Sequence, residues 1–442
     1  MKAIVTAVIA FLALGISAAE ISKAPVPPSP YLPIIYKYAD AMLEHGRDTY
    51  GPQKTGMFLS ALDRATLSAP TNRTVVFVPQ RDENFLRLLY TLSELSGKPK
   101  YRDAADAALR SYFENVGSLT NVMLPWGVSW DVTRDEPIAG TGTLDAISRP
   151  WMLWERCFAV VPTASAHMAQ ALIENREAVT RQAGYYIRTW ATAYAHTNDK
   201  SYLNAIETVL GHVEKKRNPR SGFIEYHFEF IPSGVLFTAL LSMAIDCDAA
   251  SRLVPQPLSL QLQQFAARED EIFCTRSHEI KRTRGFITSI QNARAVEEFR
   301  TLPWTDSPVT TAKVAMMCVS RYENSGDTRY RDLVHAAADT YLESLPGDNQ
   351  DVWPMTFGHA ISLQVAAWRS TAQQKYLDRA RELADLAVKR FFDQGPLPRA
   401  GLKRNHYEAR TGADTLALGL VELHLHILGI TAVRCPPNTI DR

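Results

Sequence analysis

The sequence predicts an all-α protein, an α/α toroid of six or seven helical hairpins with a few short strands in its loops. Apolar residues recur three and four positions apart on both sides of a polar break at Ser96–Pro99, which is the pattern of two amphipathic helices joined by a turn. The same joint, a polar turn followed by a tyrosine, recurs at Tyr202, Tyr330 and Tyr376. Neither helix of such a hairpin can bury its apolar stripe alone, so the hairpins are expected to pack against one another.

Two kinds of helix alternate along the chain. The segments 233–247 and 414–428 are apolar on most faces, as expected for helices buried on every side, whereas their neighbours are amphipathic. This alternation predicts an inner ring and an outer ring of helices. We favour a closed ring over an open solenoid because neither terminal hairpin has the polar outer face of a capping repeat.

The individual helices follow from apolar spacing between Gly, Pro and polar breaks. They are expected at 34–46, 82–96, 101–116, 149–161, 163–176, 179–196, 202–216, 233–247, 307–324, 330–345, 356–368, 376–392 and 414–428. Short strands are expected at 75–78 and 225–227, and 272–274 could pair with 286–288. Residues 121–150 contain Gly, Pro and Trp without a helical period, which predicts a long loop of the kind that often has a function.

The ends of the chain bear on where the protein acts. Residues 1–19 have a lysine, an apolar core and small residues at the end, as in a secretory signal peptide. A proline-rich leader (20–33), a single domain (34–430) and a tail (431–442) are expected to follow, and the protein is expected to be secreted or periplasmic. No later stretch is apolar and long enough to span a membrane.

Charge and cysteine content exclude several classes. The chain has 48 Lys and Arg against 47 Asp and Glu, so its net charge of +1 offers no footprint for nucleic acid. The 5 cysteines are odd in number and widely spaced, which does not imply a disulfide framework. Cys247 and Cys318 lie in apolar helical runs and are expected to be buried free thiols.

A closed ring predicts where chemistry could take place, because every loop that leads into an inner helix opens on the same end. These loops combine aromatic and ionisable residues, which suits a sugar ring with its apolar face and hydroxyl edge. They are Arg81–Glu83, Glu225–His227, Trp304–Asp306, Trp353–His359 and Arg404–Glu408. Each has a structural alternative: Arg81–Glu83 could cap a helix, the tryptophans and His359 could belong to the core, and a strand at 225–227 would expose only alternate side chains.

The candidate residues come from these loops and from the long loop at 121–150. As catalytic residues we expect Tyr407, His406, Arg149, Arg404 and Glu408. As substrate-binding residues we expect Trp126, Trp130, Asp131, Arg81, Tyr226 and Trp353. No HExxH, CxxC pair, glycine-rich phosphate loop or GxSxG motif occurs, and no metal ligands are assigned.

Two segments resemble a known family. The stretch 38–51, YADAMLEHGRDTYG, followed by KTGMFLSALD at 54–63, resembles the opening of the family 2 pectate lyases, and the hairpin from Asn84 to Tyr101 fits the same pattern. The resemblance covers most of the chain and is specific in its first 120 residues. It implies an α/α barrel that acts on acidic polysaccharide, with a divalent metal held by histidines and a glutamate.

The chain departs from that family where the metal ligands would lie. Val128 and Ser129 follow the tryptophan–glycine pair where a histidine is expected, and Ser148 and Arg149 stand where a His–Glu pair is expected. The segment that would bring an Arg–His pair is shortened around 175–181. The cofactor therefore stays open: the family implies a divalent metal whose ligands are missing here.

These observations predict an exported protein that acts on an acidic polysaccharide or oligosaccharide by lyase-like β-elimination. Arg149 or Arg404 would neutralise the uronate carboxylate, and Tyr407 or His406 would accept the proton. A glycoside hydrolase is one alternative, for which Asp131, Glu225 and Glu408 are candidate carboxylates. A glycan-binding protein that has lost the metal site is the other.

Overall fold

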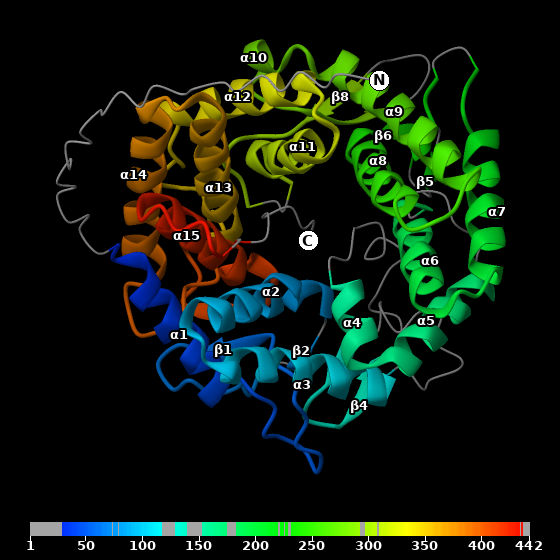
Figure 1. Cartoon of the computed structure of the whole chain (residues 1–442). Helices are drawn as coiled ribbons and strands as arrows, with labels where there is room; N and C mark the ends of the chain where they lie inside the picture. Colours follow the sequence, from blue (N-terminus) through cyan, green and yellow to red (C-terminus); the bar gives the residue numbers. More distant parts are fainter. Residues whose placement is uncertain are drawn as a thin grey trace, which may run out of the picture.

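The computed structural model describes residues 29–72, 74–77, 79–116, 129–138, 153–174, 183–219, 222–224, 226–228, 231–291, 297–306, 309–433 and 435. Within these ranges the chain forms fifteen α-helices and a few short strands. Figure 1 shows the helices arranged as a ring. The prediction of an all-α toroid is confirmed.

The ring has two layers of helices (Figure 1). The inner layer consists of α2 (Pro79–Ser96), α4 (Trp154–Val160), α6 (Ala183–Thr197), α8 (Phe237–Ser251), α11 (Thr311–Ser325), α13 (Pro354–Thr371) and α15 (Ala413–Ile427). The outer layer consists of α1 (Tyr31–His45), α3 (Pro99–Val116), α5 (Pro162–Glu174), α7 (Ser201–Lys215), α9 (Leu258–Ser277), α12 (Thr328–Leu342) and α14 (Gln374–Phe391). A short helix, α10 (Ile280–Thr283), packs beside α12.

The two layers differ in which residues they bury. In α14 the buried residues lie three or four apart, from Tyr376 and Leu377 through Ala380 and Leu383 to Phe391. This is the stripe of an amphipathic helix whose other face meets water. In α13 every residue from Pro354 to Ala367 is buried, because inner helices are covered on all sides. The alternation read from the sequence is therefore the alternation of the two layers.

The ring closes where the last inner helix meets the first hairpin. Helix α15 packs against both α1 and α2. Strand β1 (Ala61–Asp63) pairs antiparallel with β9 (His406–Glu408), with Ala61 opposite Glu408. Segments from the two ends of the domain are thus joined by helix packing and by backbone hydrogen bonds, as a closed ring requires.

The remaining strands form two small sheets. β2 (Val76–Phe77), β3 (Ser129–Asp131) and β4 (Glu136–Ile138) make one sheet. β5 (Tyr226–Phe228), β6 (Ile231–Leu236), β7 (Ile287–Gln291) and β8 (Glu297–Arg300) make the other. The strands expected at 75–78 and 225–227 are therefore present.

The strand suggested at 272–274 was wrong. These residues belong to α9, and β7 pairs instead with β6 and β8. Glu269 and Asp270 occupy buried positions of α9, so the helical period there is not visible from apolar residues alone. Their charges are matched by arginines: Glu269 pairs with Arg217, and Asp270 with Arg321.

Two smaller predictions can also be tested on the described residues. Cys247 and Cys318 are buried free thiols, as expected. None of the described helices is both long and apolar enough to cross a membrane. The signal peptide expected at 1–19 lies outside the described residues.

Candidate active site

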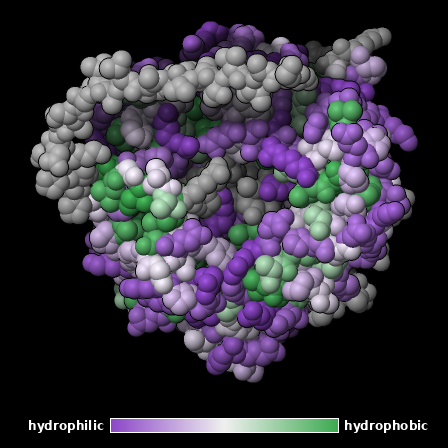
Figure 2. All heavy atoms as spheres, viewed as in Figure 1, coloured by the Kyte–Doolittle hydropathy of each residue, from purple (hydrophilic) through white to green (hydrophobic). Residues whose placement is uncertain are grey.

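The inner helices give the ring two distinct ends. A cavity of about 510 Å³ extends from Arg87 in the middle of α2 to Glu94 in its last turn, and it is also lined by Arg252 just after α8 and Asn324 in the last turn of α11. The C-terminal ends of these helices therefore meet at one end, called here the far end. At the other end the first turns of α2 and α15 meet, where Asn84 Nδ2 donates to Thr415 Oγ1 at 2.9 Å. We call the end formed by the N-terminal turns of the inner helices the mouth. The face of the ring in Figure 2 is hollowed at its middle, and hydrophilic residues border the hollow.

Ionisable residues are buried at the mouth. Asp82 and Glu83 of α2, Lys313 of α11, His359 of α13 and Asp414 of α15 are each at most 3% exposed. All five lie in the first two turns of their helices. Burying charged groups costs free energy unless they are matched, and clusters of this kind gather at functional sites. The mouth is therefore the candidate active site.

A buried pair of tyrosines lies among the carboxylates. Tyr38 Oη and Tyr407 Oη are 3.3 Å apart and share a hydrogen bond. Burial raises the pKa of Tyr38 well above its usual value, and the neighbouring Tyr407, Asp414 and Asp82 raise it further. A phenolate at Tyr38 would face two carboxylates in an apolar surrounding, so Tyr38 is expected to keep its proton.

A buried arginine, Arg87, lies in α2 close to the mouth. Arg87 lies one helical turn after Glu83 on α2 and is 4% exposed. Burial lowers the pKa of the Arg87 guanidinium, while the nearby carboxylates of Glu83 and Asp414 act in the opposite direction. Arg87 Nη1 also donates to Asn84 Oδ1 at 2.9 Å. Both carboxylates therefore act electrostatically on Arg87, which also lines the cavity of about 510 Å³.

Close packing fixes the first turn of α15. A Cβ on Gly358 of α13 would lie 2.3 Å from the carbonyl oxygen of Thr415, so only glycine permits this approach of the two helices. Thr415 in turn donates its backbone N–H to Asp414 Oδ1 at 2.7 Å. The position of Asp414 is thus set by helix packing and by its own helix terminus.

Strand β9 separates three of the predicted catalytic residues. Side chains alternate along a strand, so Tyr407 points to one face, whereas His406 and Glu408 point to the other. Tyr407 is buried against Tyr38, while His406 Nε2 lies 3.3 Å from Glu408 Oε2 on the half-buried face. The structure brings His406 and Glu408 together and places Tyr407 with the mouth carboxylates instead.

Arg404 and Trp353 meet at the start of α13. The Arg404 guanidinium carbon lies 5.4 Å from the centre of the Trp353 ring, and its Nε donates to Asp351 Oδ2 at 2.6 Å. Trp353 is the residue that precedes the first turn of α13 and is half-buried. Both predicted residues thus lie at the edge of the mouth, in contact with each other.

Other predicted residues have structural surroundings or fall outside the description. Trp130 and Asp131 are buried in β3, and Asp131 Oδ1 accepts the backbone N–H groups of Thr133 and Arg134 in a turn. Arg81 lies half-buried in the first turn of α2. Tyr226 lies in β5, though its side chain lies outside the description, as do Trp126 and Arg149 altogether.

Metal binding finds no donor set in the described ranges. No three His, Cys, Asp or Glu side chains among these residues are grouped to hold a metal ion. Of the positions at which the family resemblance would place ligands, Val128, 148–149 and 175–181 lie outside the described residues, whereas Ser129 is buried in β3. No step of the chemistry below is routed through a metal.

Three residues of the site, Asn84, Arg87 and Lys313, were not predicted from the sequence. Asp82 and Glu83 were named only as part of a loop, and Asp414 only as the end of an ionisable run. A signal was present, because each of these polar side chains stands in or directly before an apolar helical run. Asp414 precedes TLALGLV, and Lys313 is surrounded by Ala, Val and Met.

Comparison with known proteins identifies the fold. The sequence matches no family model and no curated protein. Among solved structures, the cellobiose 2-epimerase of Bacillus thermoamylovorans B4167 is similar over 90% of this chain and 100% of its own, with 11% identity and a TM-score of 0.53. A D-mannose isomerase is similar over 89% of this chain and 97% of its own, with 8% identity and a TM-score of 0.53.

A third similar structure is an inactive variant of an α-1,6-mannanase from Salegentibacter sp. HEL1_6, in which two adjacent aspartates are replaced, in complex with α-1,6-mannotetrose. It covers 89% of this chain and 99% of its own, with 11% identity and a TM-score of 0.50. At these identities the similarity concerns the fold. The chain therefore has the α/α-barrel fold found in carbohydrate-active enzymes, and membership of the family 2 pectate lyases is not shown.

Proposed function

We propose that the protein is a carbohydrate-active enzyme that hydrolyses a glycosidic bond at the mouth of the ring, with Glu83 and Asp414 as its working carboxyl groups. The observation that carries the proposal is that both carboxylates are buried at the mouth, each next in sequence to a residue of the hydrogen-bonded pair Asn84 and Thr415. Glycoside hydrolysis needs two carboxyl groups. One donates a proton to the glycosidic oxygen as the bond to the sugar carbon breaks, and the other activates the water that adds to that carbon or attacks the carbon itself.

The similar structures support a sugar substrate without deciding the reaction. Their names describe an epimerase, an isomerase and a mannanase, all of which act on carbohydrates. Hydrolysis is favoured here because three carboxylates, Asp82, Glu83 and Asp414, are concentrated in the first two turns of two adjacent helices. The mannanase complex supports an oligosaccharide as the kind of molecule that this fold can bind.

The edge of the mouth suits a substrate that carries negative charge. Arg404 covers the face of Trp353 and is itself about a third exposed, so it can reach an incoming carboxylate while the indole supports a sugar ring. We therefore propose an acidic oligosaccharide as the substrate. The signal peptide expected at 1–19 supports the further proposal that the protein meets this substrate after export.

β-Elimination, the reaction suggested by the resemblance, is less well supported. It needs a base that removes the proton next to a uronate carboxylate. Tyr407 was the expected base, but its phenol is buried and hydrogen-bonded to Tyr38, which leaves it turned away from His406 and Glu408. A hydrolase needs no phenolate, and the mouth carboxylates then have a direct use.

The decisive experiment is incubation of the protein with a panel of neutral and acidic oligosaccharides. Three readouts are followed: new reducing ends, ultraviolet absorbance of unsaturated products, and sugar isomerisation by chromatography. We expect reducing ends without new absorbance and without isomerisation. Absorbance that rises together with the reducing ends would establish a lyase, and isomerisation without cleavage would place the protein with the epimerases.

Substitutions then test the two carboxylates. Glu83→Gln and Asp414→Asn should each lower turnover by about 10²- to 10⁴-fold, because each removes a group that transfers a proton or bonds to the sugar. The matched control is Glu94→Gln, an exposed carboxylate of the same helix α2 at the far end, which should leave turnover unchanged. Equal activity of all three variants would contradict the assignment.

A further inference from the structure

The cavity at the far end has the volume and the lining of a small-molecule site. Its volume of about 510 Å³ lies within the range of pockets that hold small ligands, about 300 to 1,000 Å³. Most of its described lining comes from four inner helices, α2, α6, α8 and α11. Apolar side chains lie there beside hydroxyl and amide groups: Leu153, Ile245 and Ala249 with Thr91, Ser320 and Asn324. Such a mixed lining suits a sugar, which has an apolar face and a hydroxyl edge.

Two arginines line the inner end of this cavity. Arg87 of α2 is 4% exposed, and the Arg188 side chain of α6 is 19% exposed. Burial lowers the pKa of the Arg87 guanidinium, and the positive charge of Arg188 lowers it further, so the two groups are close enough to repel each other. Glu83 and Asp414 oppose this effect from the mouth. An anion between the two arginines would be attracted by both.

Two carboxylates of the cavity are matched by other arginines. Asp248 Oδ2 lies 2.7 Å from a nitrogen of Arg252 and 3.1 Å from a nitrogen of Arg321. Glu323 Oε1 lies 3.2 Å from a nitrogen of Arg369. These ion pairs hold the negative charge of Asp248 and Glu323 against their own cations, which limits the repulsion that a bound anion would meet.

The inner end of the cavity is therefore its more positive part. Arg188 Nη1 donates to Asp246 Oδ1 at 3.3 Å, and this contact orients the Arg188 side chain. Burial raises the pKa of Asp246 from 3.8 to about 6, although Arg188 acts against the shift. Glu94, the third acidic residue of the described lining, is exposed in the last turn of α2, at the outer end.

We propose that this cavity binds a small anionic sugar, whose carboxylate or sulfate group lies between Arg87 and Arg188. A guanidinium group is planar and can bind such an anion through two parallel N–H bonds. The rest of the cavity then holds the sugar ring. The inference goes beyond the proposed function, because the ligand is bound without reaction at the far end of the ring, whereas hydrolysis is assigned to the mouth.

Binding is tested by NMR on the wild-type protein, with one reporter in each site. The δ1 methyl signal of Ile245 reports on the cavity and is assigned by its loss in Ile245→Val. Glucuronate, glucose 6-sulfate and glucose are added separately at constant ionic strength. We expect a saturable shift with glucuronate, with glucose 6-sulfate or with both, which tells a carboxylate from a sulfate site, and no shift with glucose. An equal response to glucose, or none to either anion, overturns the inference.

Arg188→Met tests the arginine pair. It should raise the dissociation constant measured at Ile245 by about 10- to 100-fold, because it removes charge-assisted hydrogen bonds to the anion. The matched control is Arg268→Met in α9 of the outer layer, whose half-exposed side chain pairs with Glu214, and it should leave the constant unchanged. Equal affinity of Arg188→Met and wild type overturns the inference.

A second variant keeps the test valid if Arg188→Met fails to fold. Ala249→Phe places a ring in the cavity and removes no charged group. It should abolish the response of Ile245 to the anionic sugar, while circular dichroism shows that the helices are retained. An Ile245 response of unchanged affinity in Ala249→Phe would also overturn the inference.

The second reporter separates this inference from the proposed function. The indole N–H signal of Trp353 reports on the edge of the mouth and is assigned by its loss in Trp353→Phe. Arg404→Met should weaken the response of Trp353 and leave that of Ile245 unchanged. Loss of both responses in Arg404→Met would mean one site at the mouth and would overturn the inference. If no oligosaccharide is cleaved, the proposed function fails, and the Ile245 titration still decides whether the cavity binds an anion.

Discussion

Tyr407 and Tyr38 share a hydrogen bond in a buried space bounded by carboxylates, and their surroundings decide what a tyrosine can do there. We expect Tyr407→Phe to lower the free energy of unfolding by about 1 kcal/mol, the usual contribution of one hydrogen bond. Turnover should stay within a few-fold of wild type, because the carboxylates carry the reaction. Steady-state kinetics and denaturant unfolding check both expectations.

The control for that substitution is Tyr186→Phe in α6, another buried tyrosine in the inner layer. A fall in turnover of about 10³-fold in Tyr407→Phe, with wild-type stability and an unaffected control, would mean that the phenol takes part in the chemistry. The reaction would then have to be reassigned toward the tyrosine-dependent elimination that the sequence suggested.

Glu422 is buried at the far end, and burial raises its pKa from 4.5 to about 7. Ser362 and Arg369 of α13 act against this shift, Glu323 of α11 adds to it, and His426 lines the same cavity of about 290 Å³. Because the folded protein holds this proton more tightly than the unfolded chain, the contribution of Glu422 to stability is present below pH 4.5 and is lost as the pH rises through about 7.

Glu422→Gln removes this titration. Its free energy of unfolding, relative to wild type, should rise by about 3 kcal/mol between about pH 5 and about pH 8, since each pKa unit corresponds to about 1.4 kcal/mol. Urea unfolding at several pH values measures the difference. The exposed Glu207→Gln on α7 is the control and should give a flat difference, and a flat difference for Glu422→Gln as well would contradict the prediction.

At the scale of single elements, α9 explains why part of the helical pattern was missed. Leu262, Phe265, Ala266 and Phe273 follow the helical period, but two of the buried positions are occupied by Glu269 and Asp270. A pattern read from apolar residues breaks at such positions. Their partners lie on other elements, Arg217 beyond α7 and Arg321 in α11, so no local signal could announce that these acids are buried.

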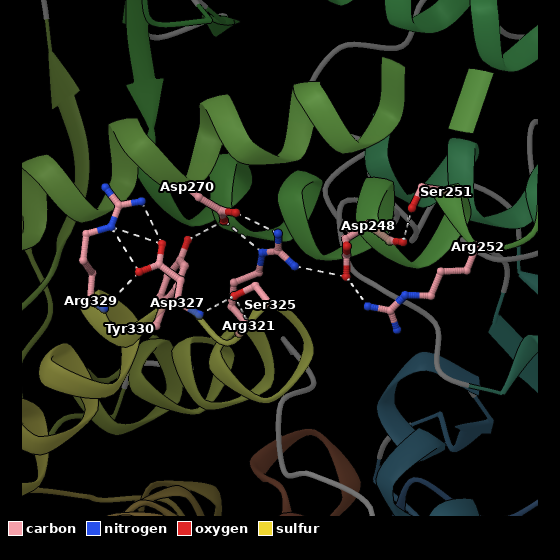
Figure 3. Close-up of polar contacts among 9 residues, drawn as sticks. All are labelled: Asp248, Ser251, Arg252, Asp270, Arg321, Ser325, Asp327, Arg329 and Tyr330. Atoms are coloured by element: carbon pink, nitrogen blue, oxygen red, sulfur yellow. Dashed lines mark hydrogen bonds and ion pairs between the residues drawn. The ribbon is translucent and has the colours of Figure 1, made fainter. Parts of the chain in front are cut away.

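Arg321, the partner of Asp270, belongs to a network of hydrogen bonds and ion pairs that joins four helices (Figure 3). Arg321 of α11 bonds both carboxylate oxygens of Asp270 in α9 at 2.9 and 2.7 Å, and its other nitrogen lies 3.1 Å from Asp248 in α8. Tyr330 of α12 donates to Asp270 at 2.7 Å. Each carboxylate is therefore matched by a cation or a phenol, which is what permits charges at the junction of these helices.

Arg321→Met should lower the free energy of unfolding by about 3 to 5 kcal/mol, because it leaves the buried carboxylate of Asp270 without its cation. Chemical denaturation measures the change. The control is Arg329→Met at the exposed end of the same network, where the arginine side chain is nearly half-exposed and its ion pair should contribute at most about 1 kcal/mol. Similar effects of the two substitutions would mean that burial does not set the strength of this network.

At the scale of the whole molecule, the closed ring could be predicted from sequence, because alternation of buried and amphipathic helices is a property of the entire chain. The end of the ring that holds the candidate site also followed, since a closed ring places all loops into inner helices on one side. The site itself was only partly predicted. Its carboxylates come from α2 and α15, which are far apart in sequence, and the contact of Asn84 with Thr415 exists only once the ring is closed.

For the loop residues, closeness in sequence was a misleading guide to closeness in the structure. Tyr407, His406 and Glu408 were grouped because they are adjacent in sequence, but the pairing of β9 with β1 directs them to opposite faces. A run of ionisable residues predicts an exposed surface or a functional site. The register of β9 against β1 then decides which of its side chains face that site. That register depends on Leu62, which lies opposite Tyr407 and comes from the other end of the chain.

Closure also predicts how the molecule unfolds, and Arg64 is the residue that tests it. Its buried guanidinium donates to the carbonyl oxygens of Phe391, Gln394 and Leu397, and it pairs with Asp393 at 2.8 Å. Arg64 follows β1 near the start of the domain, and its acceptors lie near the end. It therefore holds the first and last hairpins together.

Arg64→Met should lower the free energy of unfolding by about 3 kcal/mol, because it leaves buried carbonyl groups and a carboxylate without their donor. A closed ring has no terminal repeat that can unravel separately, so the loss should appear as one transition that far-ultraviolet circular dichroism and tryptophan fluorescence report at the same denaturant concentration. The control Arg399→Met removes the more exposed partner of the same Asp393 and should cost about 1 kcal/mol or less. Two separate transitions in Arg64→Met would instead indicate that the terminal hairpins unfold independently, as in an open solenoid. The contact between the first and last hairpins would then be only a local one.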